Sequence, residues 1–140
     1  MFTGVERIRP FSALVARLVL GVIMVVHGSQ KIFPRGALYQ FVQFVQHLGL
    51  PAWTGYLAAF TELFGGAFLI LGLLVHVAAF AIAIDMAVAI IKVHFHHGLT
   101  GPGGYEFPLA CFALAVVLMG TGPGSVAADQ YLFRGARMVR

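Results

Sequence analysis

Charged residues are scarce in this chain, and their scarcity excludes the most common class of protein. Of 140 residues, nine are Lys or Arg and five are Asp or Glu, so 10% are charged, whereas soluble domains carry roughly 25%. Hydrophobic residues make up 60% of the chain, and the mean hydropathy is +0.92. The composition therefore excludes an ordinary soluble domain and indicates an integral membrane protein. At this length we expect one domain, residues 1–140.

Cysteine is nearly absent, which limits the redox chemistry that the chain can perform alone. Cys111 is the sole cysteine, so an internal disulfide, a CxxC redox pair and a c-type haem attachment site are excluded. Electron chemistry would need a bound cofactor or a partner chain. The net charge of +4 comes from few, scattered basic residues. They lie mostly at the ends of apolar runs, and we therefore expect no nucleic acid partner.

Long apolar runs are what the chain has in abundance. Four stand out, at residues 11–28, 52–74, 77–94 and 107–120. A helix that crosses the hydrocarbon core needs about 20 residues, so the fourth run should recruit residues 104–106 or 121–124. The pattern predicts an all-α, polytopic membrane protein built as an antiparallel four-transmembrane-helix bundle. Arg17 interrupts the first run, and we expect this run to be a retained helix rather than a cleaved signal peptide.

The connections between the runs predict how the helices are arranged. Residues 41–48, in the long first connection, are amphipathic and should lie at the membrane interface. Residues 75–76 leave almost no connection between the second and third runs, which forces an antiparallel hairpin. Basic residues favour the cytoplasmic side of a membrane, and the ends of the chain carry Arg7, Arg9, Arg134, Arg137 and Arg140. We therefore expect both termini in the cytoplasm.

Three charged residues lie inside the apolar runs, near the middle depth of the predicted helices. Arg17, Glu62 and Asp85 each lie on a helix face of mainly small residues, the kind of face that packs closely in membranes. Ionisable groups at that depth are costly unless they face a bundle interior and have partners. We expect these three side chains to meet there. Either they form a buried ion-pair network that fixes helix register, or they line a binding pocket or proton relay.

A second group of polar residues is predicted toward the outer face. It contains His27, Lys31, Lys92, His94, His96, His97 and Glu106. Lys92 and Glu106 could form an ion pair, and Glu106 also suits the start of the fourth helix. We expect no metal. As an alternative, His94, His96 and His97 could bind one, because imidazole is a common metal ligand. Paired haem ligation by His27 and His94 is a further alternative.

Several short motifs, taken in order, carry a resemblance to a known family. They are Arg17-Leu18-x-Leu20-Gly21, His27-Gly28-x-x-Lys31-Ile32-Phe33, Glu62-Leu63-x-Gly65-Gly66-x-x-Leu69-x-x-Gly72, Asp85-Met86, Glu106-Phe107-Pro108-Leu109 and Gly122-Pro123-Gly124-Ser125. The chain resembles the DoxX-like family of small four-helix bacterial membrane proteins over residues 17–131. The resemblance implies a bacterial inner-membrane location. Some members of that family are membrane subunits linked to quinone-coupled sulfur oxidation, and others are associated with redox stress.

The resemblance and the polar centre together predict a membrane subunit of a quinone-linked oxidoreductase system. A quinone needs an apolar slot and hydrogen-bond donors to its carbonyl oxygens, for which the candidates are Arg17, His27, Lys31 and Lys92. Glu62, Asp85 and Glu106 are the candidates for proton handling. The expected partners are the lipid bilayer and either a second copy of the chain or a redox subunit. The alternatives are a small-molecule binder or transporter, and a non-enzymatic scaffold.

Overall fold

The computed structural model describes residues 3–132, with side chains from residue 8 onward, and every secondary-structure element in that range is a helix. The α-helices are α1 (Thr3–Ile32), α2 (Ala37–His47), α3 (Ala52–Phe60), α4 (Gly66–Leu71), α5 (Val75–Ala89), α6 (Glu106–Thr121) and α7 (Ala128–Leu132). Two π-helical segments, η1 (Thr61–Gly65) and η2 (Ile90–His94), continue α3 and α5, and a short 3₁₀ turn, η3 (Phe95–His97), follows η2. Of the basic residues used to predict orientation, Arg134, Arg137 and Arg140 lie outside the described residues.

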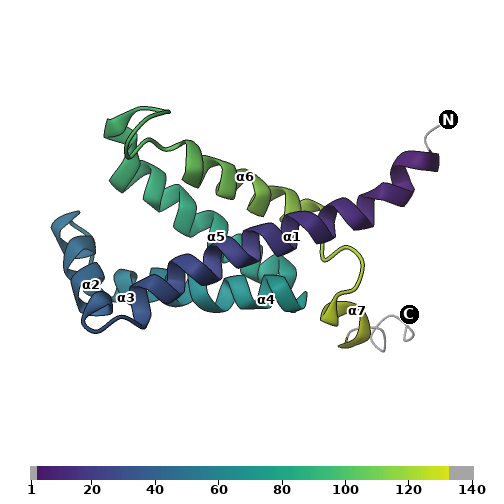
Figure 1. Ribbon diagram of the computed structural model, residues 1–140, viewed down its shortest axis with the longest axis horizontal. Helices are drawn as coiled ribbons and strands as arrows, with labels where there is room; N and C mark the ends of the chain where they lie inside the picture. Colours follow the sequence, from purple (N-terminus) through teal and green to yellow (C-terminus); the bar gives the residue numbers. More distant parts are fainter. Residues whose placement is uncertain (1–2, 133–140) are drawn as a thin grey trace.

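Four apolar helices form the bundle, as the hydropathy predicted (Figure 1). Three are long and apolar enough to cross a bilayer, over Ile8–Ile32, Ala52–Leu71 and Val75–His97. The fourth, α6, has 16 residues, about 24 Å at 1.5 Å per residue. It gains Glu106 and Thr121 but not the longer flanks that we expected, because Gly122 has a φ of 74° and ends the helix. The chain is therefore an all-α polytopic membrane bundle.

At several glycines, the backbone of α1 lies directly against the backbone of the second crossing, Ala52–Leu71. A Cβ atom placed on Gly28 would lie 2.5 Å from the Leu63 backbone nitrogen. A Cβ on Gly66 would lie 2.7 Å from the Gly21 carbonyl oxygen. Small residues at helix contacts let two membrane helices approach closely. The α1 contact with η1 and α4 therefore depends on having no side chain at these three positions.

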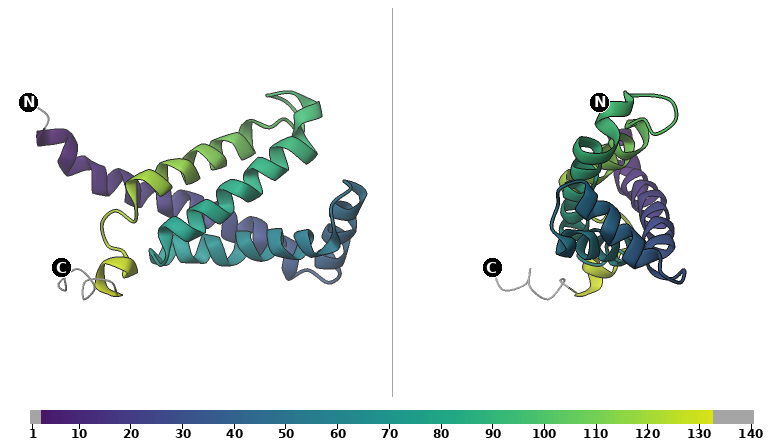
Figure 2. Two further views of the ribbon diagram at one scale, coloured as in Figure 1. Left: turned by 180° about the vertical axis from the view of Figure 1, so that it is seen from behind. Right: turned by 90° about the vertical axis from the view of Figure 1, so that its left-hand side faces the viewer.

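The α5–α6 hairpin leans away from the other two crossings at one end of the bundle. Helix α5 packs along α6 and meets the second crossing at η1 and α4. Figures 1 and 2 show the hairpin tilting away from α1 and α3, with α2 standing at the open end. The predicted segment 41–48 falls largely within α2, which buries Val42 and Val45 and contacts α3 closely at Gly55. The core lies toward the other end, where Leu20, Leu69, Ile82 and Leu118 are fully buried.

At the end of the bundle opposite α2, Arg17 binds the C-terminal loop. The side chain is 1% exposed, and its guanidinium nitrogens donate to the Pro123 carbonyl at 2.7 Å and the Val126 carbonyl at 2.9 Å. The prediction that Arg17 meets Glu62 or Asp85 is wrong. Both hydrogen bonds that the Arg17 side chain makes with described residues are accepted by main-chain oxygens. Every residue has a main-chain oxygen, so the residue types in the sequence do not show which ones Arg17 binds.

The same C-terminal segment also caps α5. The Asp129 carboxylate accepts hydrogen bonds from the backbone N–H groups of Leu74, at 2.7 Å, and Val75, at 3.0 Å. The Asp129 backbone N–H donates to the Gly72 carbonyl. The first N–H groups of a helix have no partner within the helix, so a carboxylate there stabilises its start. We call Arg17, residues 122–129 and the α4–α5 turn the clasp.

Adding one methyl group at Gly28 should loosen the contact between α1 and η1. We expect Gly28→Ala to lower the free energy of unfolding by about 1–3 kcal/mol, the usual cost of overpacking. Gly120→Ala is the matched control, because a Cβ at Gly120 would meet nothing within 4 Å. The measurement is the midpoint of thermal unfolding of both variants in lipid nanodiscs. Equal midpoints for the two variants would contradict the proposed packing.

Removing the guanidinium of Arg17 should open the clasp. Arg17→Met leaves two loop carbonyls without donors, and we expect it to cost about 2 kcal/mol or more of unfolding free energy. We also expect faster proteolytic cleavage after residue 121. Arg35→Met, at an exposed arginine in the loop before α2, is the control. An Arg17→Met protein with the control's protease resistance would show that the clasp does not depend on this side chain.

Candidate functional site

A cavity of about 630 Å³ opens where the α5–α6 hairpin leans away from α1 and α3. Its walls are α1, α2, the second crossing from α3 to η1, and the third from α5 to η2. Most of its lining is apolar, and ligand pockets of this size combine such a lining with a few placed polar groups. The polar side chains in the lining are His27, Lys31, Thr54, Thr61, Glu62, Asp85, Lys92 and His94.

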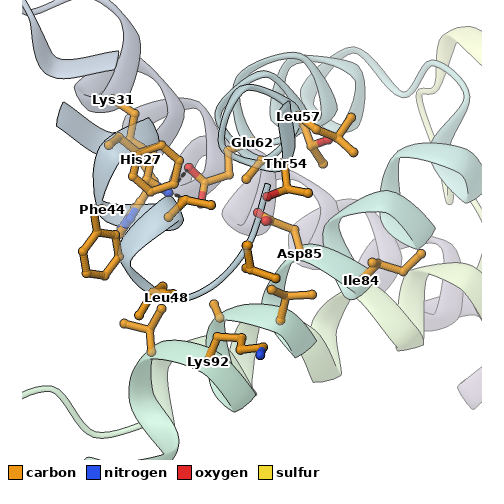
Figure 3. Close-up of a pocket in the computed structure, with 18 of the residues that line it drawn as sticks. His27, Lys31, Phe44, Leu48, Thr54, Leu57, Glu62, Ile84, Asp85 and Lys92 are labelled. Carbon is orange, nitrogen blue, oxygen red and sulfur yellow. Dashed lines mark hydrogen bonds and ion pairs between the residues drawn. The ribbon is translucent and has the colours of Figure 1, made fainter. Parts of the chain in front are cut away.

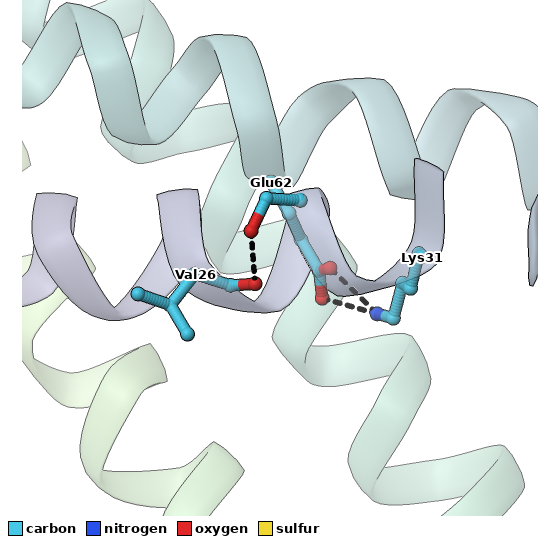
Figure 4. A network of polar contacts seen from close by, with 4 residues as sticks. Val26, Lys31 and Glu62 are labelled. Carbon is cyan, nitrogen blue, oxygen red and sulfur yellow. Dashed lines mark hydrogen bonds and ion pairs between the residues drawn. The ribbon is translucent and has the colours of Figure 1, made fainter. Parts of the chain in front are cut away.

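An ion pair between α1 and η1 lies on one side of the cavity. The Lys31 ammonium is 2.6 Å from both carboxylate oxygens of Glu62, as Figure 4 shows. The Glu62 side chain is 4% exposed and the Lys31 side chain 26%, and the ammonium also lies 4.5 Å from the centre of the Phe41 ring. Lys31 follows Gly28 by almost one turn, so the close glycine contact brings the two charges together. The expected partner of Glu62 was Arg17, and its actual partner is Lys31.

Asp85 approaches the same polar centre from the opposite wall. Its carboxylate projects from α5 and lies within electrostatic range of Glu62 and Lys31 (Figure 3). The Oδ2 atom is buried and has no hydrogen-bond partner within the part of the chain that the structure describes. A buried polar atom without a partner is uncommon in proteins, because leaving it unpaired costs free energy. The geometry therefore leaves one carboxylate oxygen available to a group inside the cavity.

Two π-helical segments shape the walls that carry the polar residues. Segment η1 holds Thr61 and Glu62, and η2 holds Lys92 and His94. Short π-helical stretches occur often at functional sites, because the extra residue in the turn changes the direction of the following side chains. A regular α-helix rotates by about 100° per residue about its axis, and the residues of these two segments depart from that regular rotation. His96, one of the outer polar residues predicted from the sequence, does not line the cavity.

The histidine and lysine side chains of the outer group take separate positions. His27 lines the cavity and stacks on Phe107, with ring centres 5.2 Å apart. Lys92 also lines the cavity and makes no ion pair with Glu106 in the described residues, so that predicted pair is wrong. A His94 ring nitrogen lies 2.7 Å from the Gly103 carbonyl oxygen and ties η2 to the following loop.

The remaining candidates lie away from the cavity. Arg17 belongs to the clasp, and Glu106 is exposed at the start of α6. Within residues 3–132 no group of three or more His, Cys, Asp or Glu side chains is arranged to hold a metal ion. The structure therefore gives no support to the alternative of a metal site at His94, His96 and His97. Sequence reasoning missed Phe41, Thr54 and Thr61, which carry no signal beyond their places in amphipathic or apolar segments.

Comparison with known proteins identifies the family. The model of the DoxX family matches residues 12–95, more than half of the chain. The chain belongs to the DoxX family. All the charged and histidine residues of the cavity lie inside the matched region, and Glu106 lies outside it.

One curated relative of this DoxX protein has a similar length. The Bacillus subtilis (strain 168) protein named "Putative oxidoreductase CatD" is 28% identical over 124 residues, which is 89% of each chain. No solved structure matches the chain. The resemblance recognised from the ordered motifs is thereby confirmed at the level of the family.

Breaking the ion pair from one side should cost more than removing both charges. Lys31→Met leaves the Glu62 carboxylate buried without a partner, and we expect a loss of about 3 kcal/mol of unfolding free energy. The double variant Lys31→Met with Glu62→Gln should recover most of that loss. Thermal unfolding of the two single variants and the double variant forms a double-mutant cycle that isolates the coupling. Lys92→Met, at a cavity lysine without an ion pair, is the control, and strictly additive effects would contradict the coupling.

Proposed function

We propose that this DoxX protein is a membrane subunit of a quinone-linked oxidoreductase system and binds a quinone headgroup in the cavity. The observation that carries the proposal is the Oδ2 atom of Asp85, which has no hydrogen-bond partner among the described residues and lies near the Lys31–Glu62 ion pair in a mostly apolar cavity. The name of the B. subtilis relative, an oxidoreductase, supports the same class of reaction. A bound quinone supplies a carrier for two electrons and two protons.

The cavity holds donors suited to quinone carbonyl oxygens. A lysine ammonium has three N–H donors, and Lys31 directs its hydrogen bonds to the two oxygens of Glu62, so one donor remains for a ligand. Lys92 makes no hydrogen bond or ion pair with another described residue and lines the same cavity. His27 lines the α1 side and can donate from a ring nitrogen. These three residues would hold and orient the ring.

In this proposal the two cavity carboxylates, Asp85 and Glu62, handle the protons. Asp85 has a free oxygen that can accept a proton from a hydroxyl group or, once protonated, donate one to an oxygen of the ligand. Glu62 is held by Lys31 and lies within electrostatic range of Asp85, so its charge influences how readily Asp85 holds a proton. Electrons would be exchanged with a partner redox subunit, consistent with a chain that has a single cysteine.

Trp53, the sole tryptophan of the chain, lines the cavity and provides the measurement. We expect a tail-less methylated benzoquinone to quench its fluorescence saturably when the protein is in lipid nanodiscs. Asp85→Leu should weaken this binding about tenfold, the equivalent of about 1.4 kcal/mol, because it removes the free carboxylate oxygen. Glu106→Leu, at an acidic residue outside the cavity, should leave the binding unchanged.

Two results would contradict the proposal. One is quenching that never saturates, which would describe a quinone dissolved in the bilayer rather than one bound to the protein. The other is an equal loss of binding in Asp85→Leu and Glu106→Leu, which would show that the quinone does not bind at the polar centre. Either result would favour the alternatives of a transporter or a scaffold.

A further inference from the structure

Four side chains on α3 and α5 both line the cavity and are exposed. Leu57 on α3 and Ile84 on α5 both line the cavity, and yet they are 57% and 51% exposed. Trp53 on α3 and Phe80 on α5 also line the cavity, and their side chains are exposed as well. Side chains that both line a cavity and face outward lie at its mouth. We call the gap between these four residues the slot.

The slot lies at the depth of the hydrocarbon core. Leu57 is inside the apolar crossing Ala52–Leu71, and Ile84 is near the middle of the crossing Val75–His97. The surroundings of a crossing at that depth are lipid chains, so the slot opens into the bilayer rather than into water. At the end of the bundle, α2 contributes Phe41, Phe44 and Val45 to the lining, and Leu48, the residue after α2, also lines the cavity.

Two of the polar side chains lie across Asp85 from two slot residues. In Figure 3, His27 and Lys31 lie on one side of Asp85, whereas Leu57 and Ile84 lie on the other. A ligand that satisfies both sides needs a polar ring and a long apolar extension. A small polar solute would leave the slot to lipid chains, and a plain hydrocarbon would leave the Asp85 oxygen unpartnered.

We propose that the ligand is a tailed quinone that enters from the bilayer, with its ring at the polar centre and its hydrocarbon tail leaving through the slot between α3 and α5. This inference rests on the proposed function and specifies its substrate class. The tail packs between Leu57 and Ile84 and continues among the lipid chains. The protein therefore selects ligands that are already dissolved in the membrane.

The test narrows the slot without touching the polar centre. Leu57→Phe with Ile84→Phe adds an aromatic ring on each side of the mouth. The matched control is Val116→Phe with Val117→Phe, two exposed aliphatic positions on α6 that do not line the cavity. Each protein in nanodiscs is titrated with a tail-less benzoquinone and with the same headgroup carrying two isoprene units. The readout is the midpoint of saturable Trp53 quenching, expressed as quinone per lipid.

Tailed and tail-less quinones should respond differently to the narrowed slot. We expect the slot variant to bind the tailed quinone about tenfold more weakly and the tail-less quinone within twofold of the unmodified protein, with the control unchanged for both. Unchanged binding of the tailed quinone, or equal losses for both ligands, would overturn the slot and leave the quinone site standing. If neither quinone binds the unmodified protein saturably, the proposed function and this inference are both wrong.

Discussion

The close contact of α1 with η1 is the constraint on which the polar centre depends. With no side chain at Gly28, the two backbones meet, and Lys31 then lies within 2.6 Å of both oxygens of Glu62. A buried carboxylate in a membrane is costly on its own, and this pairing makes it tolerable. Because Glu62 is neutralised in this way, Asp85 remains as the acidic group of the cavity without a hydrogen-bond partner for Oδ2. The packing of three glycines therefore determines which carboxylate can interact with a ligand.

The two ends of the bundle are built for different tasks. At one end the clasp binds two guanidinium nitrogens of Arg17 and caps the start of α5, and the core around Leu20 and Ile82 is fully buried. At the other end the helices diverge, and the polar side chains line a cavity. A firmly packed end allows the opposite end to stay open, because the open end contributes less buried apolar surface to stability. Site and scaffold are thus separated along the length of the same four helices.

Hydropathy was sufficient to predict the four apolar helices and the tight turn between the second and third crossings, and it singled out the amphipathic segment 41–48 that falls largely within α2. Ordered motifs were sufficient to identify the family. The pairing of charges was predicted less well. Arg17 bonds to carbonyl oxygens, which every residue possesses, so its partners could not be read from side-chain types. The two π-helical segments change which residues share a helix face. The residue types at positions 61–65 and 90–94 do not predict a π-helix.

The clasp has a consequence for the biogenesis of the protein. Arg17 and the Val126 carbonyl that it binds are separated by 109 residues, and ribosomes extend a chain at about 5–20 residues per second. Helix α1 is therefore synthesised on the order of 5 to 20 seconds before the carbonyl groups that accept the hydrogen bonds of Arg17. During that interval the arginine must be solvated by lipid headgroups, water or the insertion machinery. A side chain of α1 thus gains its hydrogen-bond acceptors only from a segment that is made 109 residues later.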